Sequence, residues 1–174
     1  MEKHKVCSFI GHREINETEE LKSRLKSVIT NLIENEKVER FLFGSRSEFD
    51  NLCHAVVTEL KEKYKQLKRI YYTCKSEACV FESERQEQER ILSKYLKREV
   101  SLRGFEEEFE HKTKYEAGKA SYIKRNQAMI DDSDFCVFYY NEDYTPSTKT
   151  NSGTKIAYKY AIKMKKKVIN LFKC

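Results

Sequence analysis

The sequence predicts an α/β fold in which an open, mostly parallel sheet of about five strands lies between helices on both faces. Short runs of apolar residues alternate along the chain with longer segments whose apolar residues recur at helical spacing. The gaps between them are short, which is typical of parallel strands joined by helices. The 174 residues match the usual size of one domain.

The first half of the chain is expected to form strand, helix, strand, helix and strand. The strands are predicted at residues 5–10 (KVCSFI), 38–44 (VERFLFG) and 69–74 (RIYYTC). The first helix is predicted at 18–34, where Leu21, Leu25 and Ile29 share one face, and the second at 47–64. Asn16, three residues before Glu19, is the expected N-cap of the first helix.

The second half begins with a change in composition. Residues 75–114 are dense in Glu, Lys and Arg and contain no strand of comparable quality. We expect a helical or mobile excursion here within a single domain, 1–174. A helix at about 115–130, a strand at 135–140 (FCVFYY), a helix beginning near Gly153 and a last strand at 168–172 (VINLF) are predicted to follow.

The charge balance favours an anionic ligand without specifying one. The 34 basic and 28 acidic residues give a net charge of +6 and are mixed along the chain instead of forming a basic arm. No apolar run approaches the ~20 residues needed to span a bilayer, and no signal peptide is evident, so we expect a cytoplasmic protein. The cysteines lack the spacing of zinc sites, and no metal is expected.

Glycines mark three of the expected strand-to-helix junctions, at Gly11, Gly44 and Gly153. The carboxyl ends of parallel strands meet at one edge of the sheet, where loops and helix N-termini bind ligands. Glycine lets backbone amides approach a phosphate closely. Polar donors stand beside these glycines: His12, Arg13, Ser45, Arg46, Ser152 and Thr154. We therefore predict an anion-binding site at this edge.

Several common sites are excluded by their missing motifs. The sequence contains no P-loop, no Gly-x-Gly-x-x-Gly turn, no Gly-x-Ser-x-Gly elbow and no His-Glu-x-x-His helix. Asp131, Asp132 and Asp134 suggest a metal, but capping and turn formation explain them better, because they lie opposite the expected ligand edge. Tyr144, after the fourth strand, is a candidate to stack on a base.

Four segments carry a family resemblance: CSFIGHRE, GSRSEFDNLC, YIKRNQAMIDDSDFCVFYY and NSGTKIAYKYAIKMKKKVINLF. Together they resemble the SLOG superfamily of Rossmann-like proteins, and within it the bacterial YpsA-like branch. The resemblance implies a nucleotide or nucleotide-derived ligand. It also implies that the ligand edge is lined by Gly11, His12 and Arg13, by Gly44, Phe49 and Asp50, by Arg125 and Asn126, and by Ser152, Gly153 and Thr154. A packing or subunit-interface role for Arg125 stays open, because this residue lies more than halfway along its helix.

The resemblance also bears on catalysis. Phosphoribohydrolases and deoxyribosyltransferases related to this superfamily place a glutamate shortly after the Gly-Thr pair, where this chain has Ala157. A carboxylate is needed there to stabilise or attack an oxocarbenium-like centre. We therefore favour a sensor or signalling component without catalysis over an enzyme acting on N-glycosidic bonds, in which Glu142 or Asp143 would have to substitute.

The expected partner is a nucleotide-derived small molecule. Single-stranded DNA binding, as in the DNA-processing relatives of the superfamily, is a second alternative, supported mainly by the mild basic charge. The dispersed charge nevertheless argues against nucleic acid as a partner, and no membrane association is expected. The sequence leaves a homo-oligomer open.

Overall fold

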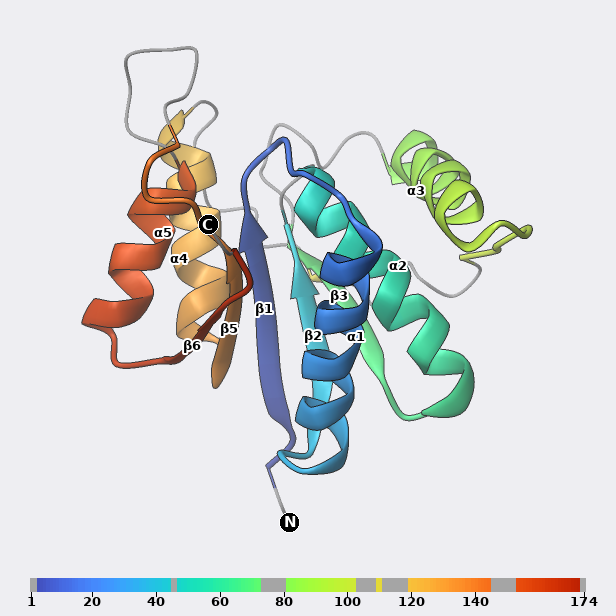
Figure 1. The fold of residues 1–174 in the computed structure, drawn as a ribbon, viewed down its shortest axis with the longest axis horizontal. Helices are drawn as coiled ribbons and strands as arrows, with labels where there is room; N and C mark the ends of the chain where they lie inside the picture. The colour runs from blue at the N-terminus through green and yellow to red at the C-terminus, as the bar shows by residue number, and fades with distance from the viewer. Residues whose placement is uncertain are drawn as a thin grey trace.

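A computed structural model describes residues 3–44, 47–72, 81–102, 109–110, 119–144 and 153–172. Its centre is a parallel sheet with helices on both faces (Figure 1). The strands are β1 (Lys5–Gly11), β2 (Val38–Phe43), β3 (Lys68–Tyr72), β4 (Phe109–Glu110), β5 (Phe135–Tyr139) and β6 (Lys167–Asn170). The predicted fold class, a Rossmann-like open parallel sheet between helices, is confirmed.

The strand order is β4-β3-β2-β1-β5-β6, and all pairs are parallel. The chain therefore builds one half of the sheet outward from β1 and then returns to the other side of β1 for β5 and β6. This reversal places a topological switch point between β1 and β5, where open α/β sheets bind their ligands. Gly11 pairs with Tyr139 at the carboxyl ends of these two strands.

The helices follow the predicted periodicity closely. They are α1 (Glu19–Glu34), α2 (Glu48–Lys63), α3 (Phe81–Leu96), α4 (Lys119–Asp131) and α5 (Gly153–Lys163). The predicted N-cap of α1 is wrong: Thr18, not Asn16, has the extended backbone of a cap, and its Oγ1 accepts a hydrogen bond from the amide of Leu21 at 3.1 Å. Ser47 caps α2 in the same way, since its Oγ accepts from the amide of Asp50 at 3.0 Å.

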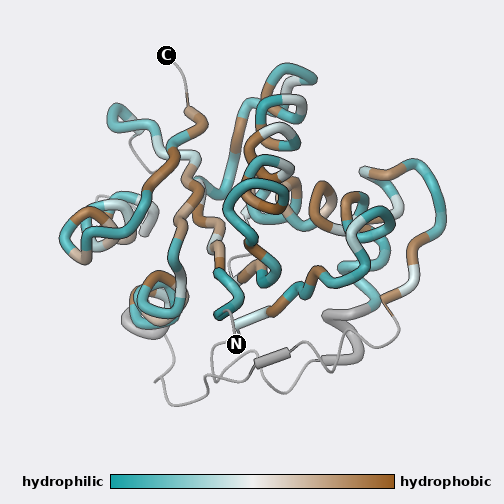
Figure 2. Tube along the Cα trace, turned by 90° about the horizontal axis from the view of Figure 1, so that it is seen from below, coloured by the Kyte–Doolittle hydropathy of each residue, from teal (hydrophilic) through white to brown (hydrophobic). Residues whose placement is uncertain are grey.

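Two apolar cores lie on the two faces of the sheet. The larger one packs α1 and α2 against the sheet and includes Phe9, Phe41 and Phe43, whose rings stack on one another. The smaller core lies on the α4 and α5 side and includes Met129 and Phe138. Figure 2 shows this arrangement as apolar residues along the central strands and on the helix sides that face them.

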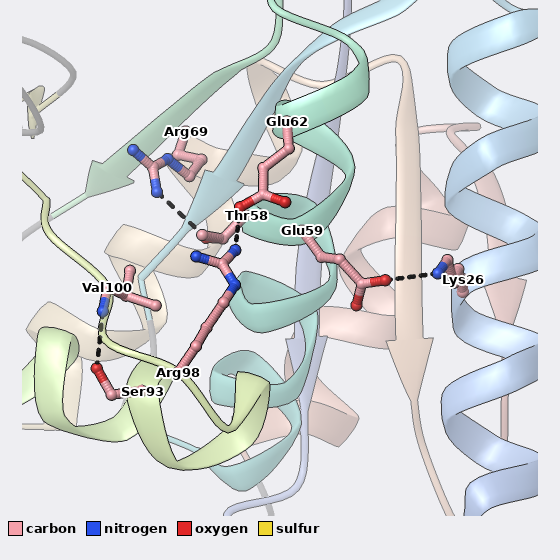
Figure 3. Close-up of polar contacts among 8 residues, drawn as sticks. All are labelled: Lys26, Thr58, Glu59, Glu62, Arg69, Ser93, Arg98 and Val100. Atoms are coloured by element: carbon pink, nitrogen blue, oxygen red, sulfur yellow. Dashed lines mark hydrogen bonds and ion pairs between the residues drawn. The ribbon is translucent and has the colours of Figure 1, made fainter.

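The charged interval between β3 and α4 contains α3 and β4, of which β4 was not predicted. The helix α3 packs on the outside of α2, where Gln88 approaches His54. Figure 3 shows further links in this region: Arg98 forms an ion pair with Glu62 of α2, and the Oγ of Ser93 accepts from the amide of Val100 at 3.1 Å. The organisation as a single domain, 1–174, stays a prediction. No described helix is long and apolar enough to cross a membrane.

Candidate functional site

The switch point between β1 and β5 is held together by His12, the residue after β1. Its side chain is only 2% exposed. Its Nε2 accepts a hydrogen bond from the amide of Asn141 at 2.8 Å, and its ring stacks on Tyr144 with 4.2 Å between ring centroids. His12 therefore fixes the start of the loop that leads from β5 toward α5.

The protonation of His12 follows from these contacts. A nitrogen that accepts a hydrogen bond carries no proton, so Nε2 is unprotonated and the proton of the neutral ring sits on Nδ1. Burial also lowers the pKa of His12, which favours the neutral ring. Nδ1 has no hydrogen-bond partner among the described residues. The switch point thus holds a buried N–H donor that lacks an acceptor within this part of the chain.

Gly11, the last residue of β1, has a packing role. A Cβ atom built on Gly11 would lie 2.3 Å from Cδ1 and 2.6 Å from Cβ of Phe49, closer than real Cβ contacts come. Phe49 belongs to the first turn of α2 and is fully buried. The glycine therefore lets α2 approach β1, and its predicted contact with a ligand stays a prediction.

Arg13 follows His12 and has an exposed side chain. Its backbone carbonyl accepts from the amide of Glu48 at 2.9 Å, and the carboxylate of Glu48 accepts from the amide of Ile15 at 2.8 Å. The loop after β1 is thus tied to the N-terminus of α2. This arrangement holds the backbone of Arg13 in place while its guanidinium is accessible to an anion.

A buried ionic cluster lies at the carboxyl end of β2. The carboxylate of Asp50 accepts from the backbone amide of Gly44 and interacts with the charge of Arg125. Both side chains are 3% exposed. A Cβ on Gly44 would lie 3.1 Å from Nε of Arg125 and 2.5 Å from Sδ of Met129. Burial raises the pKa of Asp50, and Arg125 and the amide of Gly44 counteract this rise.

The structure thus brings Gly44, Asp50 and Arg125 together, although Arg125 lies in the second half of α4. The helix passes close to the end of β2, so the guanidinium reaches the sheet edge. Asn126, the next residue of α4, is 8% exposed, and its Oδ1 has no hydrogen-bond partner among the described residues. The Oδ1 of Asp50 also lacks one.

The remaining predicted residues belong to two loops. Gly153 is exposed and begins α5, and no heavy atom lies within 4 Å of a Cβ built on it. Thr154 is buried in the first turn of the same helix. Ser45, Arg46 and Ser152 lie outside the described residues.

Sequence reasoning missed two contributors to this edge. Asn141 acts through its backbone amide, which leaves no side-chain signal. Glu48 binds the amide of Ile15, and its only sequence signal is its position just after the capping residue Ser47. Tyr144 was a candidate to stack on a base, and the structure places its ring on His12.

The residues considered for catalysis and metal binding have other surroundings. Ala157 is buried in the core beneath α5, while Glu142 and Asp143 are exposed. The three aspartates after α4 accept hydrogen bonds from structural partners: Asp131 from Tyr160 at 2.7 Å, Asp132 from Tyr72 at 2.5 Å and Asp134 from the amide of Val6 at 3.0 Å. These contacts tie α4 to β1, β3 and α5.

A groove of ≈320 Å³ lies elsewhere, between α1, α2 and α3. Leu52, Val56 and Leu96 form part of its lining, and Lys26 and Glu59 form an ion pair of 2.6 Å beside it (Figure 3). None of the predicted ligand residues lines this groove.

Comparison with solved structures supports the fold. DNA processing protein A from Helicobacter pylori, which binds single-stranded DNA, matches with a TM-score of 0.56 and 14% sequence identity. The match covers 94% of this chain and 63% of that chain, so this chain spans less than two thirds of its neighbour. The expectation that argued against nucleic acid as a partner is wrong, because this fold also occurs in a protein that binds single-stranded DNA.

Sequence comparison gives the family. No curated protein matches the chain significantly. A family model described as "YspA SLOG family" matches residues 7–173, nearly the whole chain. This match agrees with the motifs at both ends of the sequence. The chain therefore belongs to the YpsA family of SLOG proteins.

Proposed function

We propose that the protein binds a nucleotide or nucleotide-derived molecule at the carboxyl edge of the sheet, as a sensor or signalling component. The observation that carries this proposal is the buried Nδ1–H donor of His12 at the switch point. A buried donor without an acceptor costs about 1–3 kcal/mol. A phosphate oxygen is an acceptor of the required kind, and binding one would recover this free energy.

Two neighbouring features support a phosphate at this position. Arg13 is exposed next to His12 and provides a cation. The helix α5 follows β5 and begins with Gly153 and Thr154, and backbone amides at a helix N-terminus attract anions. Arg125 is less suited to this task, because its charge is already balanced by Asp50.

Isothermal titration calorimetry with nucleoside monophosphates, NAD, ADP-ribose and cyclic nucleotides tests the proposal. We expect at least one of these compounds to bind, and Arg13→Ala to weaken its binding by about tenfold, as for the loss of one charge-assisted hydrogen bond. Arg90→Ala is the matched control, since Arg90 is an exposed arginine on α3. Failure of the whole panel to bind would contradict the proposal.

A second candidate function is single-stranded DNA binding, which is favoured by the structural likeness to DNA processing protein A. This function makes a different prediction. Binding to an oligonucleotide should weaken steeply with salt, because the released counterions scale with the number of phosphates contacted. An oligo(dT) that binds with such a salt dependence, while mononucleotides do not bind, would favour the DNA-binding function.

A further inference from the structure

We propose that the ligand edge recognises the ribose hydroxyls of its nucleotide through Asp50 and Asn126, and therefore selects ribonucleotides over deoxyribonucleotides. This inference rests on the nucleotide-binding function proposed above. It starts from two oxygen atoms, Oδ1 of Asp50 and Oδ1 of Asn126. Both are buried, and neither has a hydrogen-bond partner in the part of the chain that the structure describes.

Both oxygens flank the carboxyl end of β2. The other carboxylate oxygen of Asp50 accepts from the amide of Gly44, the residue after this strand. Asn126 follows Arg125, whose Nε lies 3.1 Å from the Cβ position of Gly44. The two acceptors come from α2 and α4, which cover opposite faces of the sheet (Figure 1). They therefore converge on the sheet edge from both sides.

The chemistry of these acceptors narrows the group that they bind. Phosphate oxygens at neutral pH accept hydrogen bonds and are repelled by the carboxylate of Asp50. A divalent cation is disfavoured by the positive charge of Arg125, and the described residues contain no group of three or more potential metal-binding His, Cys, Asp or Glu side chains. A ribose hydroxyl is a neutral donor, and a ribonucleotide carries two of them side by side.

The position of His12 is consistent with this assignment. His12 presents a donor at the end of β1, and the two acceptors lie at the end of β2, the neighbouring strand. Adjacent strands are about 4.8 Å apart, which is within the length of a nucleoside monophosphate. A nucleotide lying across this edge would place its phosphate near His12 and its sugar near Asp50 and Asn126.

Calorimetric titration of the full chain tests this inference. The four ribonucleoside 5′-monophosphates are compared with their 2′-deoxy and 3′-deoxy analogues. We expect removal of a hydroxyl to weaken binding by at least about tenfold, because it leaves a buried acceptor unpaired. In Asn126→Ala this discrimination should shrink toward unity. The matched control is Gln127→Ala, which removes the neighbouring amide on α4 and should leave the discrimination unchanged.

Asp50→Asn provides a second variant. Because the amide of Gly44 holds one oxygen of this side chain, the new NH₂ group takes the position of Oδ1 and turns an acceptor into a donor. This change should also abolish the preference for ribonucleotides. If Asp50→Asn does not fold, as judged by circular dichroism, the comparison of Asn126→Ala with Gln127→Ala decides the question.

The outcomes separate the two proposals. Equal binding of ribonucleotides and both deoxy series to the unmodified protein overturns the hydroxyl inference and leaves nucleotide binding intact. A preference that survives in both Asn126→Ala and Asp50→Asn overturns it as well. Absence of binding by every compound overturns nucleotide binding and this inference together.

Discussion

Protonation of His54 is expected to destabilise the fold as the pH falls below about 6.5. His54 lies on α2 and is 2% exposed. Its Nδ1 is 3.3 Å from Oε1 of Gln88, and its ring centroid is 4.8 Å from that of Phe43. Burial, together with the charge of Arg69, lowers its pKa to about 3. The folded protein therefore keeps this imidazole neutral over most of the acid range.

The size of the effect follows from the difference between the folded and unfolded states. In the unfolded chain the histidine titrates near pH 6.5, so between about pH 6.5 and 3 the unfolded state binds one proton more than the folded state does. The free energy of unfolding then falls by about 1.4 kcal/mol per pH unit. At pH 5.0 the loss relative to pH 7.5 is about 2 kcal/mol from His54 alone.

Urea denaturation at pH 7.5 and pH 5.0 measures this loss. The variant His54→Asn retains a polar group near Nδ1 and does not titrate, so its loss of stability should be smaller than that of the unmodified protein by about 2 kcal/mol. His4→Asn is the matched control, because the side chain of His4 is 64% exposed, and it should behave like the unmodified protein. If His54→Asn loses as much stability as the unmodified protein, the reasoning is refuted.

Three further predictions concern the backbone and the switch point. Gly11→Ala should lower the free energy of unfolding by about 1–3 kcal/mol in urea denaturation, because the new Cβ overlaps Phe49; an unchanged value would contradict the packing role. Lys165→Gly should raise the same quantity by about 1 kcal/mol, because Lys165 has φ 57° at the end of α5; an unchanged or lower melting temperature would refute it. His12→Phe removes the acceptor for the amide of Asn141, so hydrogen exchange at this amide should become faster, and unchanged protection would show that the bond does not hold the loop.

The order of elements and the ligand edge follow from local patterns. Strands such as β1 and β5 are continuous apolar runs because both faces of a parallel sheet are buried, and α1 and α2 show apolar residues at helical spacing because one side faces the core. The glycines at the strand ends follow from the turns, and the SLOG motifs lie at these same turns. Where periodic burial was absent, prediction failed: β4 has two residues, too few to show a pattern.

Only the tertiary structure decided which partner each polar or special residue has. Whether Gly11 borders a ligand or another side chain depends on the approach of α2, which brings Phe49 onto it. The role of His12 depends on a backbone amide 129 residues away in sequence, and such a donor is common to every non-proline residue. Arg125 reaches Gly44 because α4 packs close to the end of β2. These pairings are set by the packing of distant elements, and the spacing of residues along the chain does not contain that information.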